Sequence, residues 1–374
     1  MLKRLHVKNF TVFAEADFEF SPGLNVIIGT NGTGKSQVMK LGYVLESTYS
    51  AIMRPVKGSA SSSDLGHLDT SVTFPDAPIA FGMAGRLREV FLTSDLHKLV
   101  RRPISVSEVL PNHSEFEANF EKDGVGTLQF TLPSLTSPPT DLIHRRPGVI
   151  GLQTGKPVFI PAKEMLSLMP DIIGLSDKYA DLLDATYTGL ARALVVPLLK
   201  NPPAYAESVL ASVGALLQGR VEAENGRFYL APQQGGERFD INLVAEGYRK
   251  LGTLAYLLAN GSLSQENTLY WDEPEANLNP ALLRELARLL LLLANQGFQI
   301  ILATHSLFLL KEFHILAHEQ QSTVRYFGLS AQPGEATQVS MRDNLELLPD
   351  IVALDAELDQ SDRFQAVLDQ EDAH

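Results

Sequence analysis

Cysteine is absent from this chain of 374 residues. Its absence excludes disulfide bonds and metal centres held by thiolates. Proteins of reducing compartments commonly lack disulfides, and we therefore expect a cytoplasmic protein. The first residues, Met1 to His6, agree with this expectation, because no apolar run of signal-peptide length follows their charges.

Long apolar runs are also absent. The longest extends from Leu289 to Ala294, far below the roughly 18 to 20 residues that a membrane-spanning helix requires. We therefore expect no membrane association. With 45% hydrophobic residues, the chain can still bury one large α/β core, or a core domain with a sizeable insertion.

Positive charge is in short supply, since the formal net charge is −13. This charge argues against a protein that coats nucleic acid through its global field, although a local basic strip can still bind phosphates. Two local basic groups occur in the first half of the chain. They are Arg86, Arg88, His97, Lys98, Arg101 and Arg102, and then His144, Arg145 and Arg146. They form either solvated faces or contacts for nucleic acid or a partner.

Acidic residues gather at the C-terminal end, within residues 341–374. They predict a solvated acidic tail or helix. Such a segment either solubilises the protein or docks a basic partner.

One stretch predicts a phosphate-binding loop. It is Gly29-Thr30-Asn31-Gly32-Thr33-Gly34-Lys35-Ser36, which follows the apolar strand Leu24 to Ile28. Glycines let consecutive backbone N–H groups point into one concavity, and the next helix adds the positive end of its dipole. Lys35 then reaches the β- and γ-phosphates, and the Ser36 hydroxyl takes one position on Mg²⁺. We expect the nucleotide to be bound by Thr30, Asn31, Gly32, Thr33, Gly34, Lys35 and Ser36. An ordinary glycine-rich turn is the alternative.

A second apolar strand ends in acids, in the stretch Thr268 to Glu275. Two adjacent carboxylates at the edge of a buried sheet are costly unless they have a task. We expect Asp272 to hold Mg²⁺, largely through its waters. We expect Glu273 to be catalytic, by orienting and polarising the water that attacks the γ-phosphate. The alternative is an acidic strand end without a ligand.

A third apolar strand, Phe298 to Ala303, is followed by His305. Ligands of open α/β sheets lie at the C-terminal ends of strands, which predicts His305 as a catalytic residue near the γ-phosphate. A structural histidine is the alternative. Before this strand, Asn279 and Pro280 predict the start of a helix that runs to Asn295.

The pattern divides the chain into five expected parts. These are residues 1–54, the first part of the nucleotide-binding core; 55–150, an insertion outside the central sheet; 151–240, helices and strands that return to the core; 241–340, its second part; and 341–374, the acidic end. Alternation of polar and apolar residues predicts strands at Leu2 to Phe10 and Ala16 to Phe20. No sustained heptad repeat precedes residue 240, so we expect no long coiled coil.

Between these motifs the elements are less sharply defined. Asp171 to Leu199 predicts mostly helix, whereas Val221 to Leu230 and Phe239 to Leu243 predict strands. The candidate core positions of the helical part are Leu182, Leu183, Leu190, Leu194 and Leu198. Another helix opens at Ala245-Glu246-Gly247 and ends at Asn260-Gly261. It is either a plain capped helix or one whose N-terminal glycine receives phosphate oxygens.

Taken in order, these motifs give a family resemblance. The chain resembles an ABC-type ATPase head of the SMC, RecF and OLD-like group, often labelled AAA family ATPase. The matching stretches are Asn9-Phe10, Gly23 to Ser36, Asp272 to Glu275, Asn277 to Pro280, and Thr304 to Ser306. The resemblance covers the first fifty residues and roughly Leu243 to Lys311. It implies an α/β P-loop head whose mixed central sheet is flanked by helices, with a large insertion.

The resemblance also implies a dimer. Two heads meet head to tail, and each ATP lies between the phosphate loop of one and the signature helix of the other. Gly247 is then expected to contact the γ-phosphate in trans. This chain has Ala245-Glu246-Gly247 where transporters have serine followed by two glycines, and Arg249 or Lys250 is a candidate to supply the missing contact in trans. Gln153 is a candidate for the metal-contacting glutamine of the family, by its order along the chain.

Two functions follow as alternatives. The first is a Mg²⁺-dependent, ATP-hydrolysing dimer that acts as a motor or switch on DNA or on an effector, in DNA repair or anti-phage defence. The second is a nucleotide-gated scaffold that sequesters a nuclease or toxin, with slow hydrolysis. No cluster of carboxylates on strand ends predicts a Toprim-type nuclease in the acidic end, so a separate partner protein is expected to carry any such activity. A transporter subunit is disfavoured, because the signature sequence is incomplete.

Overall fold

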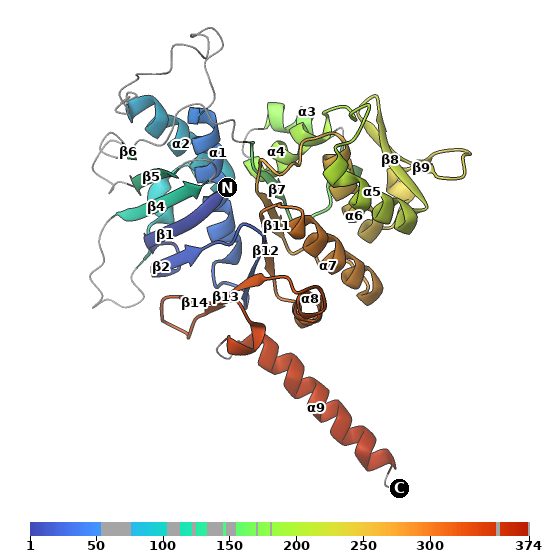
Figure 1. Ribbon diagram of the computed structural model, residues 1–374. Helices are drawn as coiled ribbons and strands as arrows, with labels where there is room; N and C mark the ends of the chain where they lie inside the picture. The colour runs from blue at the N-terminus through green and yellow to red at the C-terminus, as the bar shows by residue number, and fades with distance from the viewer. Residues whose placement is uncertain are drawn as a thin grey trace.

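The computed structural model describes residues 1–53, 76–102, 113–121, 125–132, 145–146, 155–169, 171–179, 182–348 and 352–372. Within them the chain forms two larger sheets that are stacked, with helices between and around them, and a small third sheet of three strands (Figure 1). Gln153 and His144 lie outside the described residues.

The central sheet has six strands in the order β14-β13-β3-β12-β11-β7. All neighbours are parallel except the edge pair β13 and β14. The six strands are β3 (Leu24–Gly29), β7 (Val158–Ile160), β11 (Leu269–Asp272), β12 (Ile300–Thr304), β13 (Val324–Ser330) and β14 (Gln338–Arg342). Every residue of β3 is buried, as expected for a parallel strand covered on both faces. The predicted mixed α/β architecture is confirmed.

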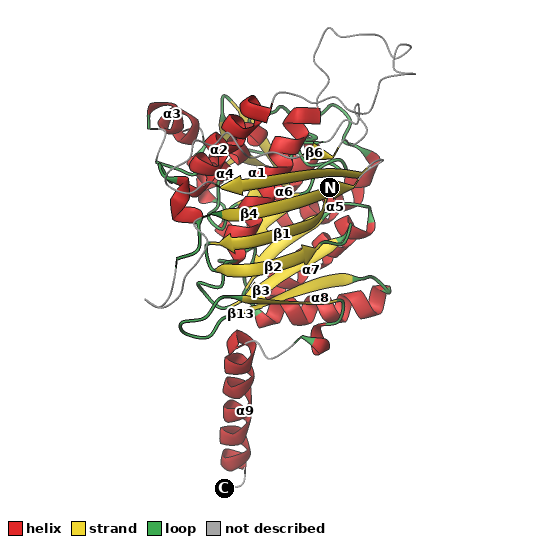
Figure 2. Ribbon diagram, turned by 90° about the vertical axis from the view of Figure 1, so that its left-hand side faces the viewer, coloured by secondary structure: helices red, strands yellow, loops and turns green. Residues whose placement is uncertain are grey.

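The second sheet is antiparallel, in the order β2-β1-β4-β5-β6. Its strands are β1 (Leu2–Phe10), β2 (Phe13–Glu19), β4 (Ser114–Glu121), β5 (Val125–Leu132) and β6 (Arg145–Arg146). Figure 2 shows β1, β2 and β4 in front of the central sheet. The segment 55–150 contributes no described strand to the central sheet. Its strands instead continue a sheet that the first residues begin, because β4 pairs along β1.

Helices fill the space between the sheets and cover the far face of the central one. They are α1 (Lys35–Met53), α2 (Asp76–Phe91), α3 (Asp171–Lys178), α4 (Ala185–Leu194), α5 (Ala204–Leu217), α6 (Glu246–Ala259), α7 (Pro280–Asn295), α8 (Leu307–Gln320) and α9 (Val352–Asp372). Buried side chains of α1 belong to the same core as both sheets. The acidic helix α9 projects from the body (Figures 1 and 2). It is the longest described helix, with 21 residues, and the part of the chain described contains no long coiled coil.

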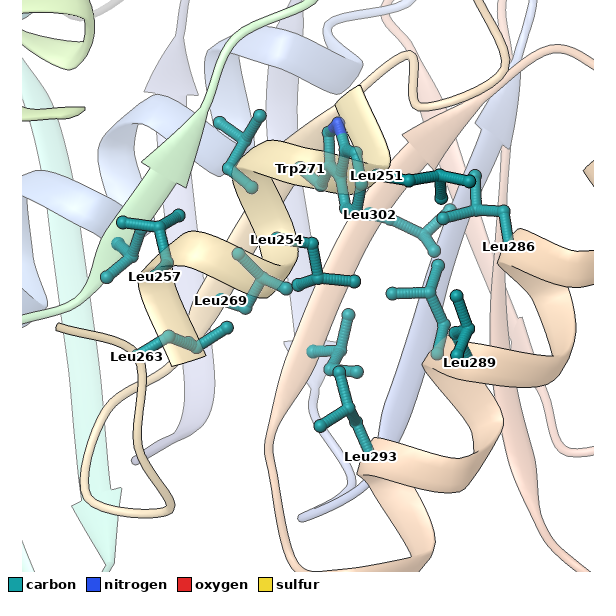
Figure 3. Close-up of a cluster of buried hydrophobic side chains, with 14 of the residues drawn as sticks. Leu251, Leu254, Leu257, Leu263, Leu269, Trp271, Leu286, Leu289, Leu293 and Leu302 are labelled. Atoms are coloured by element: carbon teal, nitrogen blue, oxygen red, sulfur yellow. The ribbon is translucent and has the colours of Figure 1, made fainter. Parts of the chain in front are cut away.

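The larger core lies between the central sheet and helices α5, α6 and α7. Figure 3 shows leucines of α6 and α7 packed around Trp271 and Leu302 of the strands β11 and β12. Trp271 and Leu302 are both fully buried. Burial of one such side chain stabilises the fold by about 1.5–3 kcal/mol, so this cluster contributes to the stability of the central sheet.

The opposite ends of the strands are joined by one buried amide. Gln299 accepts hydrogen bonds from the Leu2 N–H at 3.0 Å and from the Thr268 hydroxyl at 2.8 Å. Its Nε2 donates to the carbonyls of Leu2 and Ser21, at 2.7 and 3.0 Å. All the hydrogen-bonding groups of the amide are therefore satisfied. Since these residues begin or precede β1, β3, β11 and β12, Gln299 ties both sheets together at their N-terminal edge.

Two sequence expectations were wrong in detail. The expected strand Val221 to Leu230 is a hairpin of β8 (Gly219–Glu224) and β9 (Arg227–Pro232), because Asn225 and Gly226 adopt positive φ angles of 52° and 77°. This is the backbone that a two-residue Asn-Gly hairpin turn requires. The expected strand Phe239 to Leu243 shortens to β10 (Phe239–Asp240) and one 3-10 turn.

The helical stretch from Asp171 is divided. A new helix, α4, begins after Asp184, whose carboxylate accepts from the Thr186 N–H at 2.9 Å. Of the predicted core positions, Leu190 and Leu194 are buried, whereas Leu182 and Leu198 are 53% and 38% exposed. None of the described helices is long and apolar enough to span a membrane.

Candidate functional site

The phosphate loop connects β3 to α1, and its glycines adopt conformations that other residues rarely take. Gly32 and Gly34 have φ angles of 84° and 94°. A Cβ on Gly34 would lie 2.7 Å from Val12 and from the Phe13 ring. The loop is closed by the Thr33 hydroxyl, which donates to the Thr30 carbonyl at 2.9 Å. A compact, glycine-dependent turn of this kind suits phosphate binding.

The Lys35 side chain lies within this loop. It is 6% exposed, and its Nζ donates to the carbonyls of Gly29 and Thr30 at 2.8 and 3.1 Å. Burial lowers the pKa of Lys35, and the carboxylates of Glu273, Asp272 and Glu275 oppose that shift. The ammonium group thus contacts two loop carbonyls and lies within the field of the acids at and after the end of β11.

Asp272 ends β11, next to the phosphate loop. The Ser36 hydroxyl hydrogen-bonds to the Asp272 carboxylate, and burial raises the pKa of that carboxyl. Its Oδ1 atom is buried and lacks a hydrogen-bond partner. A buried, unpartnered carboxylate oxygen beside a hydroxyl is the kind of donor set that Mg²⁺ prefers, so Asp272 and Ser36 fit this ion.

Glu273 adopts a strained backbone conformation. Its φ is 45°, in the left-handed region that residues other than glycine seldom occupy. Its N–H donates to the Ala303 carbonyl at 3.0 Å, and its side chain is 35% exposed. The turn therefore directs a partly exposed carboxylate to the edge where β3, β11 and β12 end.

Glu275 is a site residue to which the sequence analysis assigned no role. Its Oε1 accepts hydrogen bonds from the Thr304 hydroxyl at 2.7 Å and the His305 N–H at 3.0 Å. The Nδ1 atom of His305 lies 3.4 Å from Glu275 and 3.9 Å from Glu273, and the ring is 50% exposed. Glu275 thus positions the histidine. The available signal was a further acid two residues after Glu273, beyond Pro274.

The N-terminus of α6 packs against the chain's own loops. A Cβ on Gly247 would meet the side chains of Leu278 and Leu282 at 2.9 and 3.0 Å. Lys250 is buried and donates to the Ala276 carbonyl at 2.8 Å. In this conformation Lys250 therefore contacts its own chain, and it does not extend toward a second head in the way that the sequence had led us to expect.

Arg249 also points inward. Its Nε lies 3.0 Å from Glu164 Oε2, without the alignment of a hydrogen bond, and its side chain is 15% exposed. Glu164 follows β7, which pairs with β11 so that Ile160 stands beside Trp271. The loop after β7 hence lies beside the strand that carries Asp272. Sequence reasoning missed this loop, because no local signal places β7 next to β11.

Among the described residues from Arg86 to Arg102, the basic side chains do not form one exposed face. Arg101 is 7% exposed, whereas Arg88, Lys98 and Arg102 are exposed. Arg86 is half-buried on α2. A nucleic-acid contact in this region would therefore depend on fewer charges than the sequence suggested.

Two protein-family profiles match the chain. One, described as an AAA domain, putative AbiEii toxin, Type IV TA system, matches residues 162–311. The other, described as an AAA domain, matches residues 4–42. Together the matched stretches make up about half of the chain, and they contain the phosphate loop, α6, Glu273 and His305.

Individual proteins agree with these profiles. The chain is 45% identical over 49 residues to the DNA replication and repair protein RecF of Streptococcus uberis, a stretch that covers 13% of this chain and 14% of RecF. The SMC head bound to the C-terminal winged-helix domain of ScpA is similar in structure, with a TM-score of 0.54, 16% identity, and coverage of 92% of this chain and 98% of that one. The SMC head of Thermotoga maritima follows, with a TM-score of 0.50, 14% identity, and coverage of 91% and 98%. The chain therefore has the fold of an SMC head and carries two AAA-domain matches, and these findings support an ABC-type ATPase head similar to those of SMC and RecF.

Proposed function

We propose that this protein binds and hydrolyses MgATP at the edge where β3, β11 and β12 end. The observation that carries the proposal is the meeting of Lys35, Asp272, Glu273 and His305 at this edge. They come from the phosphate loop and from two strands that are far apart in the sequence. Three parallel strands that deliver a cation, a metal-binding acid and a base to one edge are suited to phosphoryl transfer.

The chemistry follows from these positions. Loop N–H groups and Lys35 bind the β- and γ-phosphates, and Ser36 and Asp272 would hold Mg²⁺. When bound, that ion neutralises phosphate charge. Glu273 orients water and accepts its proton as the new P–O bond forms and the bond to the β-phosphate oxygen breaks. His305 lies beside Glu273, where it can donate to the γ-phosphate.

We further propose that the active form is a dimer. Asn31 and Gly32 are exposed, and so are large parts of Glu273 and His305. An attacking water at this open edge is not shielded from solvent. A second head that brings the N-terminus of its α6 over the γ-phosphate would close the site, with Gly247 as the contact. Arg249 in trans remains a prediction, which requires its pair with Glu164 to open.

The biological role is proposed as a cytoplasmic switch on DNA or on a separate effector protein. The matched family description names a putative toxin system, and the RecF relative is a DNA replication and repair protein. These support anti-phage defence or DNA repair as the setting. The related SMC head is bound to a domain of ScpA, which supports a separate protein partner. A nucleotide-gated scaffold with slow hydrolysis is the second candidate.

The test of the ATPase assignment is a pair of variants. Lys35→Ala should reduce MgATP turnover to background, and Glu273→Gln should reduce it about 10²- to 10⁴-fold while ATP still binds. Light scattering after gel filtration should show Glu273→Gln as a dimer with MgATP. Lys311→Met, on the exposed side of α8, is the matched control. Full turnover by Lys35→Ala would contradict the assignment.

Two further measurements address the role. If Glu273→Gln abolishes the cellular function, the hydrolysis cycle is needed; if the function persists, the ATP-bound scaffold suffices. DNA binding is tested by a salt-dependent gel shift with Arg102→Glu, because reversing the buried Arg101 would disturb folding. An unchanged shift would remove Arg102 from any DNA contact.

A further inference from the structure

The buried ammonium group of Lys250 contacts the turn that carries Glu273. Lys250 lies in α6 and is 3% exposed. Its Nζ donates to the Ala276 carbonyl at 2.8 Å and to the Glu273 carbonyl at 3.4 Å. Lysine is almost never buried to this extent unless its charge is compensated. Lys250 is therefore held here by specific partners.

Carboxylates also act on Lys250 through their charges, in addition to the two carbonyls that it contacts. Burial lowers the pKa of Lys250, and the charges of Glu246, Glu275, Glu273 and Glu164 oppose that shift. Two of these acids, Glu273 and Glu275, belong to the proposed catalytic edge. The ammonium group thus lies within the field of the site although it does not face the phosphate loop.

The turn that Lys250 contacts needs support. Glu273 has a φ of 45°, and a residue in this region costs of order 1–3 kcal/mol unless its surroundings hold it there. Within the turn, the Ala276 N–H donates to the Glu273 carbonyl at 3.2 Å. Lys250 adds a second donor to that carbonyl and a donor to Ala276. Lys250 therefore contacts the first and the last residue of the turn, Glu273 and Ala276, and stabilises it at both ends.

Lys250 also belongs to a continuous seam between α6 and the segment after β11. Asn277 donates to Glu246 at 2.8 Å, and Gly247 lies close enough to Leu278 that a Cβ would approach it to 2.9 Å. Since Glu246, Gly247 and Lys250 stand within five residues of one helix, a shift of this helix end moves the turn with it.

We propose that Lys250 is a positioning residue for Glu273, and that it couples phosphate contact at Gly247 to the placement of the catalytic carboxylate. This inference rests on the proposed ATPase function. It assigns to the basic residues of α6 a task within their own chain. ATP bound to a second head would then contact Gly247 of the first head. Through helix α6 of the first head, this contact would affect the position of Glu273 in that same chain.

The test compares Lys250→Met, Lys250→Arg and the surface control Lys311→Met in the full chain. We expect Lys250→Met to lower kcat about 10- to 100-fold, because a small misplacement of a catalytic group has effects of this size. The Kd for ATP should stay within about twofold of wild type, since Lys35 and the phosphate loop are untouched. Lys250→Arg should recover part of kcat, because it keeps the charge and the donors.

Folding is checked with the single tryptophan. Trp271 is fully buried and precedes Asp272, so its fluorescence emission reports whether β11 is intact in each variant. If Lys250→Met does not fold, Lys250→Gln replaces it, because glutamine keeps a donor but shortens its reach. The same drop in kcat at unchanged Kd is expected.

Two results would overturn the inference. One is a folded Lys250→Met protein with the kcat of Lys311→Met, and the other is a Kd for ATP that rises in step with the loss of kcat. If the wild-type chain does not turn over ATP, the proposed function itself fails. Wild-type turnover together with an unaffected Lys250→Met overturns the positioning role alone.

Discussion

The two halves of the proposed ATP site differ in what their polar groups contact. On the phosphate-loop half, Asp272 keeps a buried, unpartnered oxygen, and Glu273 and His305 are partly exposed. On the α6 half, Arg249 and Lys250 are turned inward, toward Glu164 and the turn after β11. The first half is prepared for a ligand, whereas the side chains of the second half hold its own chain in place.

This difference predicts what a second head contributes. Arg249 and Lys250 interact with their own chain, so they do not point toward a second head. What α6 can offer to a second head is its backbone, namely the N–H groups near Gly247 and the positive end of the helix dipole. We therefore expect the contact in trans to depend on the shape of the helix end more than on a side-chain cation.

The largest effect is expected from mixing two defective variants. Gly247→Ala should lower turnover about 10²-fold, because its Cβ displaces Leu278 and Leu282 and shifts the helix end. Lys35→Ala alone should be inactive. In a mixed dimer, one site combines both defects, and the other pairs an unchanged phosphate loop with an unchanged α6 end. Mixing the two proteins should therefore restore turnover in part, with the shortfall set by how far the shifted α6 end displaces Glu273 of its own chain. Steady-state ATPase assays at increasing ratios of the two proteins measure this.

The control for that experiment is a mixture of Lys35→Ala with Glu273→Gln. Both defects lie on the same half of the site, so each composite site keeps one of them and no turnover should return. Failure of the Gly247→Ala mixture to recover activity would show that Gly247 acts within its own chain.

A smaller effect on turnover is expected from the Arg249 and Glu164 pair. If Arg249 positions α6 in its own chain, Arg249→Ala and Glu164→Gln should lower turnover to a similar extent, by several-fold. Each should also lower the free energy of unfolding by about 3 kcal/mol, because a buried partner is left unpaired. Chemical denaturation and steady-state assays measure both quantities.

An arginine finger gives a different outcome for this pair. Loss of a finger costs about 10³-fold or more in turnover. Arg249→Ala would then be far worse than Glu164→Gln, and its stability would change little. That result would return Arg249 to a role in trans.

The smallest effect is expected from pH. Burial raises the pKa of Asp272, so the folded chain binds a proton there that the unfolded chain has released. Between the ordinary and the raised pKa, the ligand-free protein should therefore gain stability as pH falls, and lose it as pH rises. Mg²⁺ must displace that proton, so Mg²⁺-dependent ATP binding should weaken as the pH falls through the raised pKa of Asp272.

Asp272→Asn is the control for the pH experiment. Asparagine carries no titrating proton, so both pH dependences should become flatter in this variant, although Mg²⁺ binding itself is weakened. Fluorescent ATP titrations with and without Mg²⁺ separate the two contributions. An equally steep dependence in Asp272→Asn would assign the titration to another group.

The sequence predicted the strands and loops whose signals are local. The phosphate loop, the acids after β11 and His305 each follow an apolar run, and parallel strands bring such ends to one edge. The roles of Glu164, Glu275 and Lys250 could not be predicted, because each depends on a partner set by strand order or helix packing. The hairpin at Asn225-Gly226 did have a local signal, the Asn-Gly pair itself. It was overlooked because the residues on both sides were interpreted as one continuous strand. The pairing of β4 with β1 had no local signal, because the two strands lie far apart in the sequence and their residue patterns do not indicate which strands pair.

Gln299 gives the two sheets a common fixed end. Its hydrogen bonds join β1, β3, β11 and β12 where these strands begin, and the proposed site lies where they finish. When strands are fixed at one end, a small change in their direction displaces their other end the most. Movement of the strands on nucleotide binding would be greatest at the free end, where Val12 touches the phosphate loop. The outer sheet would then follow the inner one, and a change of one bound phosphate would reach the surface of the molecule.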